Sequence, residues 1–218
     1  MSRWTAGRCR IAAVCAALAL SFASTGAGAT ALDNFLGGLS TWTASFSQSV
    51  TDAQGKVSAR GRGQLTLVRP GRFRWEFTPA GAGEGGQLLV ADGRNLWFLD
   101  RDLDQVTVKP IDQALSQTPA MLLAGSVTRL EDSFVIQTLP RAGGLDWVKL
   151  APRGAEADFR TAKLGLAGAQ LRQMVLEDKL GQTVTINFEG GVRNASVEAS
   201  KTQFTPSAGV NVIGTPLK

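Results

Sequence analysis

Residues 65–77 read LTLVRPGRFRWEF. After the Pro-Gly pair, six residues alternate between charged and aromatic side chains, which is typical of a strand with one wet and one apolar face. The alternation puts Phe73, Trp75 and Phe77 on the apolar face. The Pro-Gly pair itself is typical of a turn. This stretch therefore predicts two strands of an antiparallel sheet, joined by a tight turn.

Arg69 is the exception in the first of these two strands. It shares a strand face with Leu65 and Leu67, which the pattern directs inward. Either Arg69 points inward with them and has a partner there, or Pro70 bends the chain and lets the guanidinium reach water. The periodicity alone favours neither interpretation.

Further strands are expected on both sides of this stretch. Alternation begins at Trp42, and turn residues such as Asp92-Gly93 and Gly190-Gly191 separate most of the later runs. No run of strands alternates with helices, which argues against a doubly wound parallel fold and favours a mainly β, antiparallel barrel or sandwich. The expected later strands are Gln87–Ala91, Asn95–Asp100, Gln105–Lys109, Phe134–Leu139, Asp146–Pro152, Ala162–Ala167, Leu171–Glu177, Thr183–Glu189 and Val192–Glu198.

Short helices are predicted at two places. Apolar residues spaced by three and four within 32–39 predict an amphipathic helix near the N-terminus. In mid-chain, residues 111–115 predict one helix and the run from Thr118 to Gly125 predicts another. Thr118 is a preferred N-cap, Pro119 suits the first helical position, and glycine commonly follows the last one.

The N-terminus has the pattern of a secretory signal peptide. Three arginines precede an apolar run over 11–22, which is shorter than the roughly 20 residues that span a bilayer. Overlapping Ala-x-Ala cleavage sites end at Ala29 and Ala31. We therefore expect residues 1–31 to be removed and 32–218 to form a single domain, whereas an uncleaved N-terminal anchor is the alternative. A lipoprotein signal is disfavoured, because Val14 precedes Cys15 where a small residue is expected.

The composition excludes several classes of function. The 218-residue chain has 23 Lys+Arg, 18 Asp+Glu and no His. Loss of the leader removes three arginines and both cysteines, which leaves 20 basic against 18 acidic residues, a net charge of +2. Without His or Cys, the mature chain has no Ser-His-Asp or Cys-His catalysis, no disulfide, and no His- or thiolate-bound metal. We expect no enzyme activity, no cofactor, and no nucleic-acid partner.

Two remaining motifs are weak. Asp100, Asp102 and Asp104 resemble the start of a calcium loop, but the glycine and the distal glutamate of that loop are missing. Residues 81–86 are rich in glycine, but no Lys-Ser/Thr pair follows and no helix opens there, so a hairpin loop is the better interpretation.

The order and spacing of short motifs along the mature chain resemble the LolA family of periplasmic lipoprotein carriers. The matching motifs are Phe46-Ser47-Gln48, residues 63–76, Val90-Ala91-Asp92-Gly93, Leu96-Trp97, residues 103–106, Thr118–Leu123, Leu150-Ala151-Pro152, residues 174–178 and 180–183, Phe188, Asn194, Phe204-Thr205-Pro206 and residues 209–213. The chain departs from the family pattern at Asn211, where Asp is common, and in having no Tyr.

The resemblance implies a fold and a task. The fold is an unclosed, highly curved antiparallel β-barrel with an N-terminal helix and a helical lid inserted in mid-chain. The task is that of a monomeric periplasmic chaperone for triacylated lipoproteins. Such a carrier receives its cargo from an ABC-type release complex in the inner membrane and delivers it to a LolB-like acceptor at the outer membrane.

The resemblance also implies roles for individual residues. Arg69 would hold the lid through backbone carbonyls near Leu123 and Ala124. Acyl chains would occupy an apolar cavity lined by Leu36, Leu65, Leu67, Phe73, Trp75, Phe77, Leu88, Val90, Met121, Leu122, Val148, Leu150, Met174, Leu176, Val184, Ile186 and Phe188.

Two other functions stay open at this point. The first is a related outer-membrane acceptor or a carrier of another lipid, although an acceptor would carry a lipidated N-terminal cysteine. The second is an exported enzyme or an envelope-stress sensor that shares the half-barrel. An enzyme would need convergent polar groups in the pocket, and a sensor would normally have an anchor or a second domain.

Overall fold

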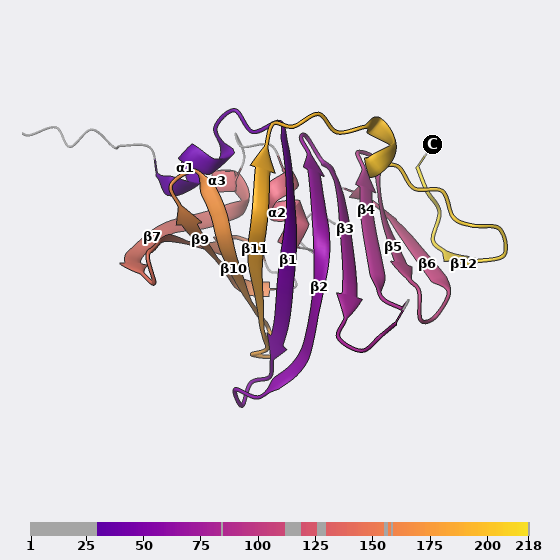
Figure 1. Cartoon of the computed structure of the whole chain (residues 1–218), viewed down its shortest axis with the longest axis horizontal. Coiled ribbons are helices and arrows are strands. Elements are labelled where there is room, and N and C mark those ends of the chain that lie inside the picture. Colours follow the sequence, from indigo (N-terminus) through magenta and orange to yellow (C-terminus); the bar gives the residue numbers. More distant parts are fainter. Residues whose placement is uncertain are drawn as a thin grey trace, which may run out of the picture.

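The computed structural model describes residues 30–83, 85–111, 119–125, 130–154, 157 and 159–217, with the backbone alone for 119–121. Strands account for most of this part of the chain (Figure 1). The elements are α1 Ala31–Leu36, β1 Thr41–Thr51, β2 Val57–Val68, β3 Arg72–Pro79, β4 Gln87–Asp92, β5 Asn95–Asp100, β6 Gln105–Pro110, α2 Pro119–Ala124, α3 Leu130–Ser133, β7 Phe134–Ala142, β8 Leu145–Pro152, β9 Phe159–Ala167, β10 Gln170–Asp178, β11 Thr183–Arg193, η3 Ala199–Thr202 and β12 Asn211–Ile213.

The strands form one sheet in the order β12-β6-β5-β4-β3-β2-β1-β11-β10-β9-β8-β7. Neighbouring strands are antiparallel except that β12 runs parallel to β6. The sheet curves strongly, and its outermost strands, β7 and β12, lie at opposite edges (Figure 1). The helix α2 lies behind β1 and β11 in that view, on the inner side of the curve. The predicted fold, a mainly β and unclosed curved sheet with few helices, is confirmed.

The hairpin predicted from residues 65–77 is present as β2 and β3. Leu65 pairs with Trp75 and Leu67 with Phe73, so the predicted apolar faces of both strands coincide. Gly71 has φ +70°, a left-handed conformation that glycine adopts without strain, and this explains the tight turn. The β2 strand begins earlier than the alternation suggested, because glycines at 61 and 63 interrupt the apolar pattern there.

Those two glycines provide room for aromatic rings. A Cβ at Gly63 would lie 2.3 Å from the Phe46 ring, and one at Gly61 would lie 2.4 Å from the Phe77 ring. Phe46 and Phe77 both pair with Gly63 across the sheet, on β1 and β3. The apolar alternation of β2 is therefore interrupted at Gly61 and Gly63 because aromatic rings of the neighbouring strands cover the backbone there.

The prediction of a turn at Gly190-Gly191 is wrong. Both glycines lie inside β11, which runs on to Arg193, and residues 194–198 are not a strand. The register with β1 shifts between Thr43 and Ser45, so the glycines form a bulge and Gly190 takes φ +61°. A Cβ at Gly191 would lie 2.9 Å from Trp42 Nε1, which shows why this bulge needs a small residue.

The helices agree in part with the sequence pattern. α1 has a capping box, in which Thr30 Oγ1 accepts from the Asp33 N–H and Asp33 accepts from the Thr30 N–H. α2 begins at Pro119 and ends just before Gly125, as predicted. The predicted helix at 111–115 lies outside the described residues beyond Ile111, as does the proposed N-cap Thr118. α3 was not predicted.

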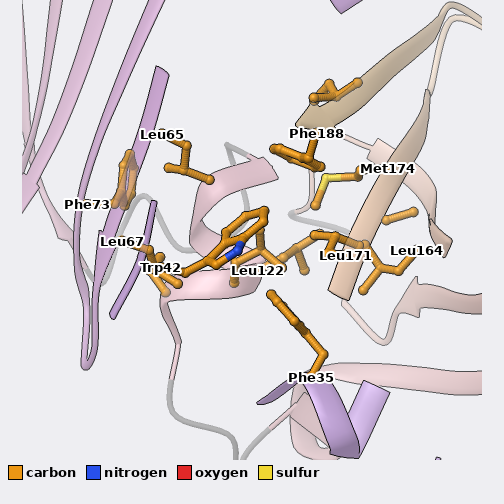
Figure 2. Packing of buried hydrophobic residues seen from close by; sticks show 14 of the residues in the cluster. Phe35, Trp42, Leu65, Leu67, Phe73, Leu122, Leu164, Leu171, Met174 and Phe188 are labelled. Atoms are coloured by element: carbon orange, nitrogen blue, oxygen red, sulfur yellow. The ribbon is translucent and has the colours of Figure 1, made fainter. Parts of the chain in front are cut away.

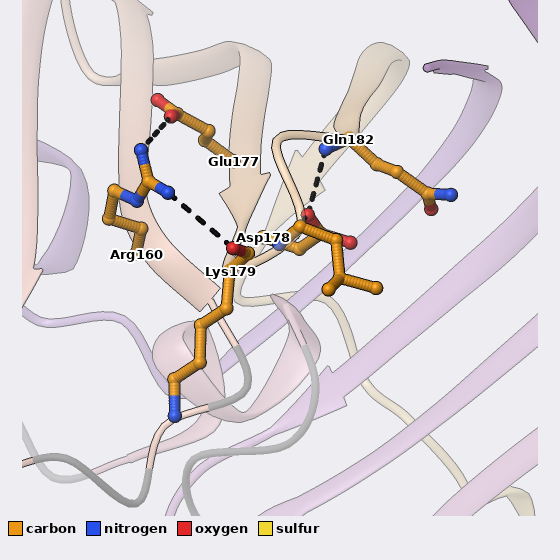
Figure 3. Close-up of polar contacts among 6 residues, drawn as sticks. Arg160, Glu177, Asp178, Lys179 and Gln182 are labelled. Carbon is orange, nitrogen blue, oxygen red and sulfur yellow. Dashed lines mark hydrogen bonds and ion pairs between the residues drawn. The ribbon is translucent and has the colours of Figure 1, made fainter. Parts of the chain in front are cut away.

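Two hairpin turns at the same end of the sheet share one design. In each, an aspartate accepts hydrogen bonds from the N–H groups two and four residues later: Asp52 from Gln54 and Lys56, and Asp178 from Leu180 and Gln182. In Figure 3, Arg160 donates hydrogen bonds to the Glu177 carboxylate and to the Lys179 carbonyl and so stabilises the second turn. The turns adjoin, since a Cβ at Gly181 would lie 3.3 Å from that of Ala53.

Candidate functional site

The largest group of buried apolar side chains lies under α1 and α2, and we name it the inner cluster. It combines side chains of these two helices with those of the curved sheet. In Figure 2, residues of β2 and β3 lie on one side and residues of β9, β10 and β11 on the other, with Trp42 and Leu122 between them. Leu122 and Leu123 of α2 are 5% and 1% exposed, so this helix closes over the cluster.

Aromatic rings form a continuous part of the inner cluster. Phe46 and Trp75 have ring centroids 4.0 Å apart, and Phe188 contacts both rings in edge-on arrangements. Trp42 joins Phe188 at 5.0 Å and extends the group toward α1. Such surfaces offer large apolar contact area with few polar atoms.

Twelve of the predicted lining residues are buried together in the inner cluster. They are Leu36, Leu65, Leu67, Phe73, Trp75, Leu122, Val148, Leu150, Met174, Leu176, Ile186 and Phe188. Phe77 and Val184 are partly buried and pack against it. The side chain of Met121 lies outside the described part of the chain.

The assignment of Leu88 and Val90 to this lining is wrong. Both belong to a second group, the outer cluster, with Trp97, Val106 and Val108. Their neighbours Leu89 and Ala91 contribute to the inner cluster instead. Because side chains alternate between faces along a strand, Leu88 and Val90 must lie on the opposite face of the sheet. Every residue of the β4 run from Leu88 to Val90 is apolar, so the sequence did not reveal which face was inner.

Several contributors were absent from the predicted lining. Phe35, Trp42, Phe46 and Leu164 are all buried in the inner cluster. The signal for two of them was present, because the alternation that starts at Trp42 places Phe46 on the same face. Phe35 lies on the apolar face of the predicted helix, but the sequence does not show that this face meets the sheet.

Arg69 is the charged residue at the edge of the inner cluster, beside α2. Its Nη2 donates a hydrogen bond to the carbonyl of Gly125, immediately after α2. The Gly71 N–H donates to the carbonyl of Ala124 at 2.9 Å. The acceptor was expected near Leu123 and Ala124, and it is the carbonyl of the next residue, Gly125. Of the two interpretations of Arg69, the inward one holds.

Burial lowers the pKa of the Arg69 guanidinium. Arginine nevertheless stays protonated in proteins, so the group remains a permanent donor. Its Nη1 is buried and has no hydrogen-bond partner among the described residues. A partly desolvated cation beside an apolar cluster is stabilised mainly by the carbonyl that it contacts.

The inner cluster offers little else to reaction chemistry. Within the described residues, the buried polar side chains are Asn95 and Thr202, which bond to Leu217 and Ala199 and not to the inner cluster. The described part of the chain contains no group of three His, Cys, Asp or Glu side chains that could hold a metal ion. No helix in that part is long and apolar enough to cross a membrane.

Comparisons with known proteins agree on one family. A sequence model described as "Outer membrane lipoprotein carrier protein LolA" matches residues 37–205. A protein named Outer-membrane lipoprotein carrier protein from Dechloromonas aromatica (strain RCB) is 37% identical over 204 residues, which cover 94% of this chain and 95% of that protein. One with the same name from Methylibium petroleiphilum is 37% identical over 207 residues, 95% and 98% of the two chains.

A solved structure matches the fold alone. The crystal structure of an uncharacterized conserved protein from Thermus thermophilus has a TM-score of 0.51 with this chain at 16% identity. The match covers 84% of this chain and 96% of that one.

Proposed function

Since the chain belongs to the LolA family of outer-membrane lipoprotein carriers, we propose that it carries acylated lipoproteins through the periplasm as a soluble monomer. It would receive them from an ABC-type release complex of the inner membrane and pass them to a LolB-like acceptor at the outer membrane. The resemblance inferred from the sequence motifs is thereby confirmed at the level of the family, whereas the partners and the transfer steps are part of the proposal.

The observation that carries the proposal is the inner cluster, an extended apolar face that lies under two short helices, α1 and α2. Burying a methylene group is worth about 0.8 kcal/mol, so a long acyl chain gains on the order of 10 kcal/mol when it leaves water. The curved sheet supplies apolar side chains from β1–β4 and β8–β11 for such burial. Leu122 and Leu123 of α2 occupy part of that surface when no cargo is present.

We name α2 the lid in this mechanism. Cargo and lid compete for the same apolar surface, so the lid must leave before acyl chains can enter. The free energy needed to open the lid is subtracted from the free energy of cargo binding, which lowers the apparent affinity. A carrier with no such competition would retain its cargo and could not deliver it.

Arg69 supports this competition because it bonds to the backbone just after the lid. A hydrogen bond from a charged donor contributes about 1.5–3 kcal/mol net. The bond to Gly125 is available in the closed form and is lost when α2 moves away. Arg69 therefore stabilises the empty, closed carrier and favours release of cargo.

The leader would be removed on export, and α1 favours one of its two cleavage sites. Cleavage after Ala29 keeps Thr30, whose N and Oγ1 lie 2.8 and 2.7 Å from Asp33 Oδ2. Cleavage after Ala31 would remove this cap and the first residue of α1, at a typical loss of about 1 kcal/mol. We expect the intact mass of the exported protein to correspond to residues 30–218, and a mass that begins at Leu32 would contradict this.

Cargo loading tests the function directly. Purified mature protein is incubated with inner-membrane vesicles that hold a labelled triacylated lipoprotein, the release complex and ATP. We expect labelled lipoprotein in the supernatant as a one-to-one complex. Label that stays in the vesicles, with a folded carrier present, would contradict the proposal.

Two matched substitutions identify the surface that binds the cargo. Met174→Ser alters the inner cluster and Val108→Ser the outer one; the two side chains are 0% and 3% exposed. Compared at equal folded concentration, the Met174 variant should take up less lipoprotein, while the Val108 variant should match the wild type. Free palmitate or a phospholipid in place of lipoprotein distinguishes a general lipid carrier, which would bind these equally well.

A further inference from the structure

Helices α1 and α2 both cover the inner cluster, but they are fastened to the sheet in different ways. We propose that Arg193 and Asn194 fix α1 as a permanent wall, so that the cavity opens by movement of α2 alone. The inference rests on the proposed function, because it names which of the two helices moves when cargo enters. In this scheme Arg193 and Asn194 are positioning residues and do not contact cargo.

Asn194 connects the end of β11 to the segment between α1 and β1. Its Oδ1 accepts from the N–H and the hydroxyl of Ser40 at 2.9 and 3.1 Å. Its Nδ2 donates to the carbonyl of Gly38 at 3.0 Å, and its backbone N–H donates to the Thr41 carbonyl at 2.8 Å. Four hydrogen bonds from one residue thus join parts of the chain more than 150 positions apart.

The backbone of Asn194 is shaped for these contacts. Its φ is +58°, in the left-handed region that non-glycine residues rarely adopt and that asparagine tolerates better than most. This conformation carries a local energy that the four bonds must offset. A strained residue with a fully bonded side chain is a position at which the structure is tightly determined.

The residues on either side of Asn194 reinforce the attachment. Arg193 Nη2 donates to the carbonyl of Gly37, the residue that caps the C-terminus of α1, at 2.8 Å. A cation at that end of a helix is also favourable for the helix dipole. The hydroxyl of Thr41 donates to the Ala195 carbonyl at 2.6 Å. Residues 193–195 together bond to every residue from 37 to 41 except Leu39, which is itself buried.

Apolar packing holds the other side of α1. Leu32, Phe35 and Leu36 are 3%, 0% and 2% exposed. The ring of Phe35 meets that of Trp42 edge-on at 5.4 Å, and Trp42 is part of β1. Moving α1 would break the hydrogen bonds at one end and expose three large side chains at the same time.

In the described part of the chain (α2 with its side chains from Leu122 on), the hydrogen bonds between α2 and the sheet lie at its last residues. The carbonyls of Ala124 and Gly125 accept from Gly71 and Arg69, and both donors belong to the turn between β2 and β3. Both of these described bonds come from the β2–β3 turn, so motion of the C-terminal end of α2 breaks them together. Competition with cargo should therefore act on α2 and leave α1 in place.

Disulfide tethers test which helix must move, because Cys9 and Cys15 are the native cysteines and both precede Thr30. The pair Ser40→Cys/Asn194→Cys replaces the Ser40–Asn194 hydrogen bonds, which hold the segment that follows α1, by a covalent bond. The pair Gly71→Cys/Ala124→Cys joins α2 to the β2–β3 turn, where the backbone N and O are 2.9 Å apart. Each oxidised protein is compared with its own reduced form, which controls for the substitutions themselves.

We expect the oxidised α1 tether to take up lipoprotein as well as its reduced form, within about twofold. The oxidised α2 tether should lose at least about tenfold in uptake and recover it after reduction. Loss of uptake in the oxidised α1 tether would overturn the inference, as would full uptake by the oxidised α2 tether. Absence of uptake by the untethered wild type would instead refute the proposed function.

Hydrogen exchange tests the same inference without cargo. Asn194→Gly keeps the left-handed backbone and removes the side chain, and Asp104→Gly is a matched control because Asp104 has φ +49° in the β5–β6 turn. The amides of Asn34 in α1 and of its C-cap residue Gly37 should exchange about tenfold faster in Asn194→Gly, equivalent to about 1.4 kcal/mol. In Asp104→Gly their exchange should be unchanged. Unchanged exchange in both variants would overturn the inference. The inference would also be overturned if, in the wild type, the α1 amides exchanged faster than those of Leu122 and Leu123.

Discussion

The two faces of the sheet each carry an apolar cluster, and the two clusters are covered in different ways. The helices α1 and α2 cover the inner cluster, and α2, which we call the inner cover, is held at its C-terminal end by Arg69 and Gly71. The chain after β11 covers the outer cluster, where Phe204 meets Trp97 at 5.5 Å and β12 extends the sheet beside β6. The outer cover is therefore joined to the sheet by its own strand, β12, whereas the inner cover is a helix that packs on the sheet.

A side-chain anchor adds to the difference. Asn95 is 3% exposed and exchanges two hydrogen bonds with the backbone of Leu217, at 2.8 and 3.1 Å. This anchor is a neutral side chain on a strand, whereas the anchor of the inner cover, Arg69, is a charged donor in the β2–β3 turn that bonds to the carbonyl just after α2. In the proposed mechanism the outer cluster stabilises the fold, and the inner cluster is the one that exchanges its cover for cargo.

The largest effect is expected from a charge in the inner cluster. Phe73 is 0% exposed, and Phe73→Glu removes a buried ring, which typically costs about 3–5 kcal/mol, and adds an unpaired carboxylate. We expect a strong loss of stability in urea unfolding, and loss of lipoprotein uptake by the protein that remains folded. The control is Thr66→Glu on the other face of β2; uptake by Phe73→Glu equal to that of the control would contradict the assignment of faces.

A smaller effect is expected at the outer cover. Asn95→Ala removes both bonds to Leu217, and typical values predict a loss of about 1–2 kcal/mol. The segment after Phe204 should then be cleaved faster in limited proteolysis, while lipoprotein uptake stays at the wild-type level. Asn187→Ala, which affects an exposed pair with Gln173, serves as the control. Reduced uptake by Asn95→Ala at equal folded concentration would mean that the outer cover also takes part in cargo binding.

The smallest effect concerns acid stability at the outer face. Burial raises the pKa of the Asp92 carboxyl. Hydrogen bonds from Trp97, from the N–H groups of Asn95 and Arg94, and from the Asn95 side chain lower the pKa by more than burial raises it. The net pKa is therefore below its ordinary value. The folded form therefore binds this proton less readily than the unfolded chain. Asp92 therefore contributes to the free energy of unfolding above pH about 3.9, and this contribution is lost as the pH falls through the pKa of Asp92 in the folded state.

Unfolding free energies measured from pH 6 to pH 3 check this expectation. The wild type should lose stability over that range more steeply than Asp92→Asn, because the substituted side chain does not titrate. Asp146→Asn is the control, since Asp146 has only a long contact with Arg141 at 3.8 Å. Equal slopes for the wild type and Asp92→Asn would show that Asp92 does not contribute.

Most of the sheet could be predicted from local pattern, because strict alternation as in β3 depends on neighbours along the chain. The pattern failed where tertiary contacts decide. The bulge at Gly190 is set by its pairing with β1 and by Trp42, and Leu88 and Val90 lie in a run that is apolar on both faces. The attachment of α1 was not predictable, since it joins residues 37–41 to 193–195, and nothing near Asn194 in the sequence indicates its partners.

The prediction for Arg69 came from combining two sources. Periodicity placed it on an inward face without deciding whether it stays there, and the family resemblance supplied a partner near the lid. In the structure the acceptor is the carbonyl of Gly125, while the Gly71 N–H bonds to the carbonyl of Ala124. One-residue differences of this kind depend on the exact path of the turn, which the sequence pattern does not contain.

The central claim is that Arg69 holds the inner cover and so sets the balance between loading and release. It is tested most directly by transfer of labelled lipoprotein from preloaded carrier to an outer-membrane acceptor, for wild type, Arg69→Leu, Arg69→Lys and the control Arg94→Leu. Loss of one charged hydrogen bond, about 1.5–3 kcal/mol, corresponds to about 10- to 150-fold tighter retention of cargo. We predict normal or stronger loading with slowed transfer for Arg69→Leu, a milder change for Arg69→Lys because the planar donor group is lost but the charge stays, and wild-type transfer for Arg94→Leu. Wild-type transfer by Arg69→Leu together with weaker loading would contradict the account.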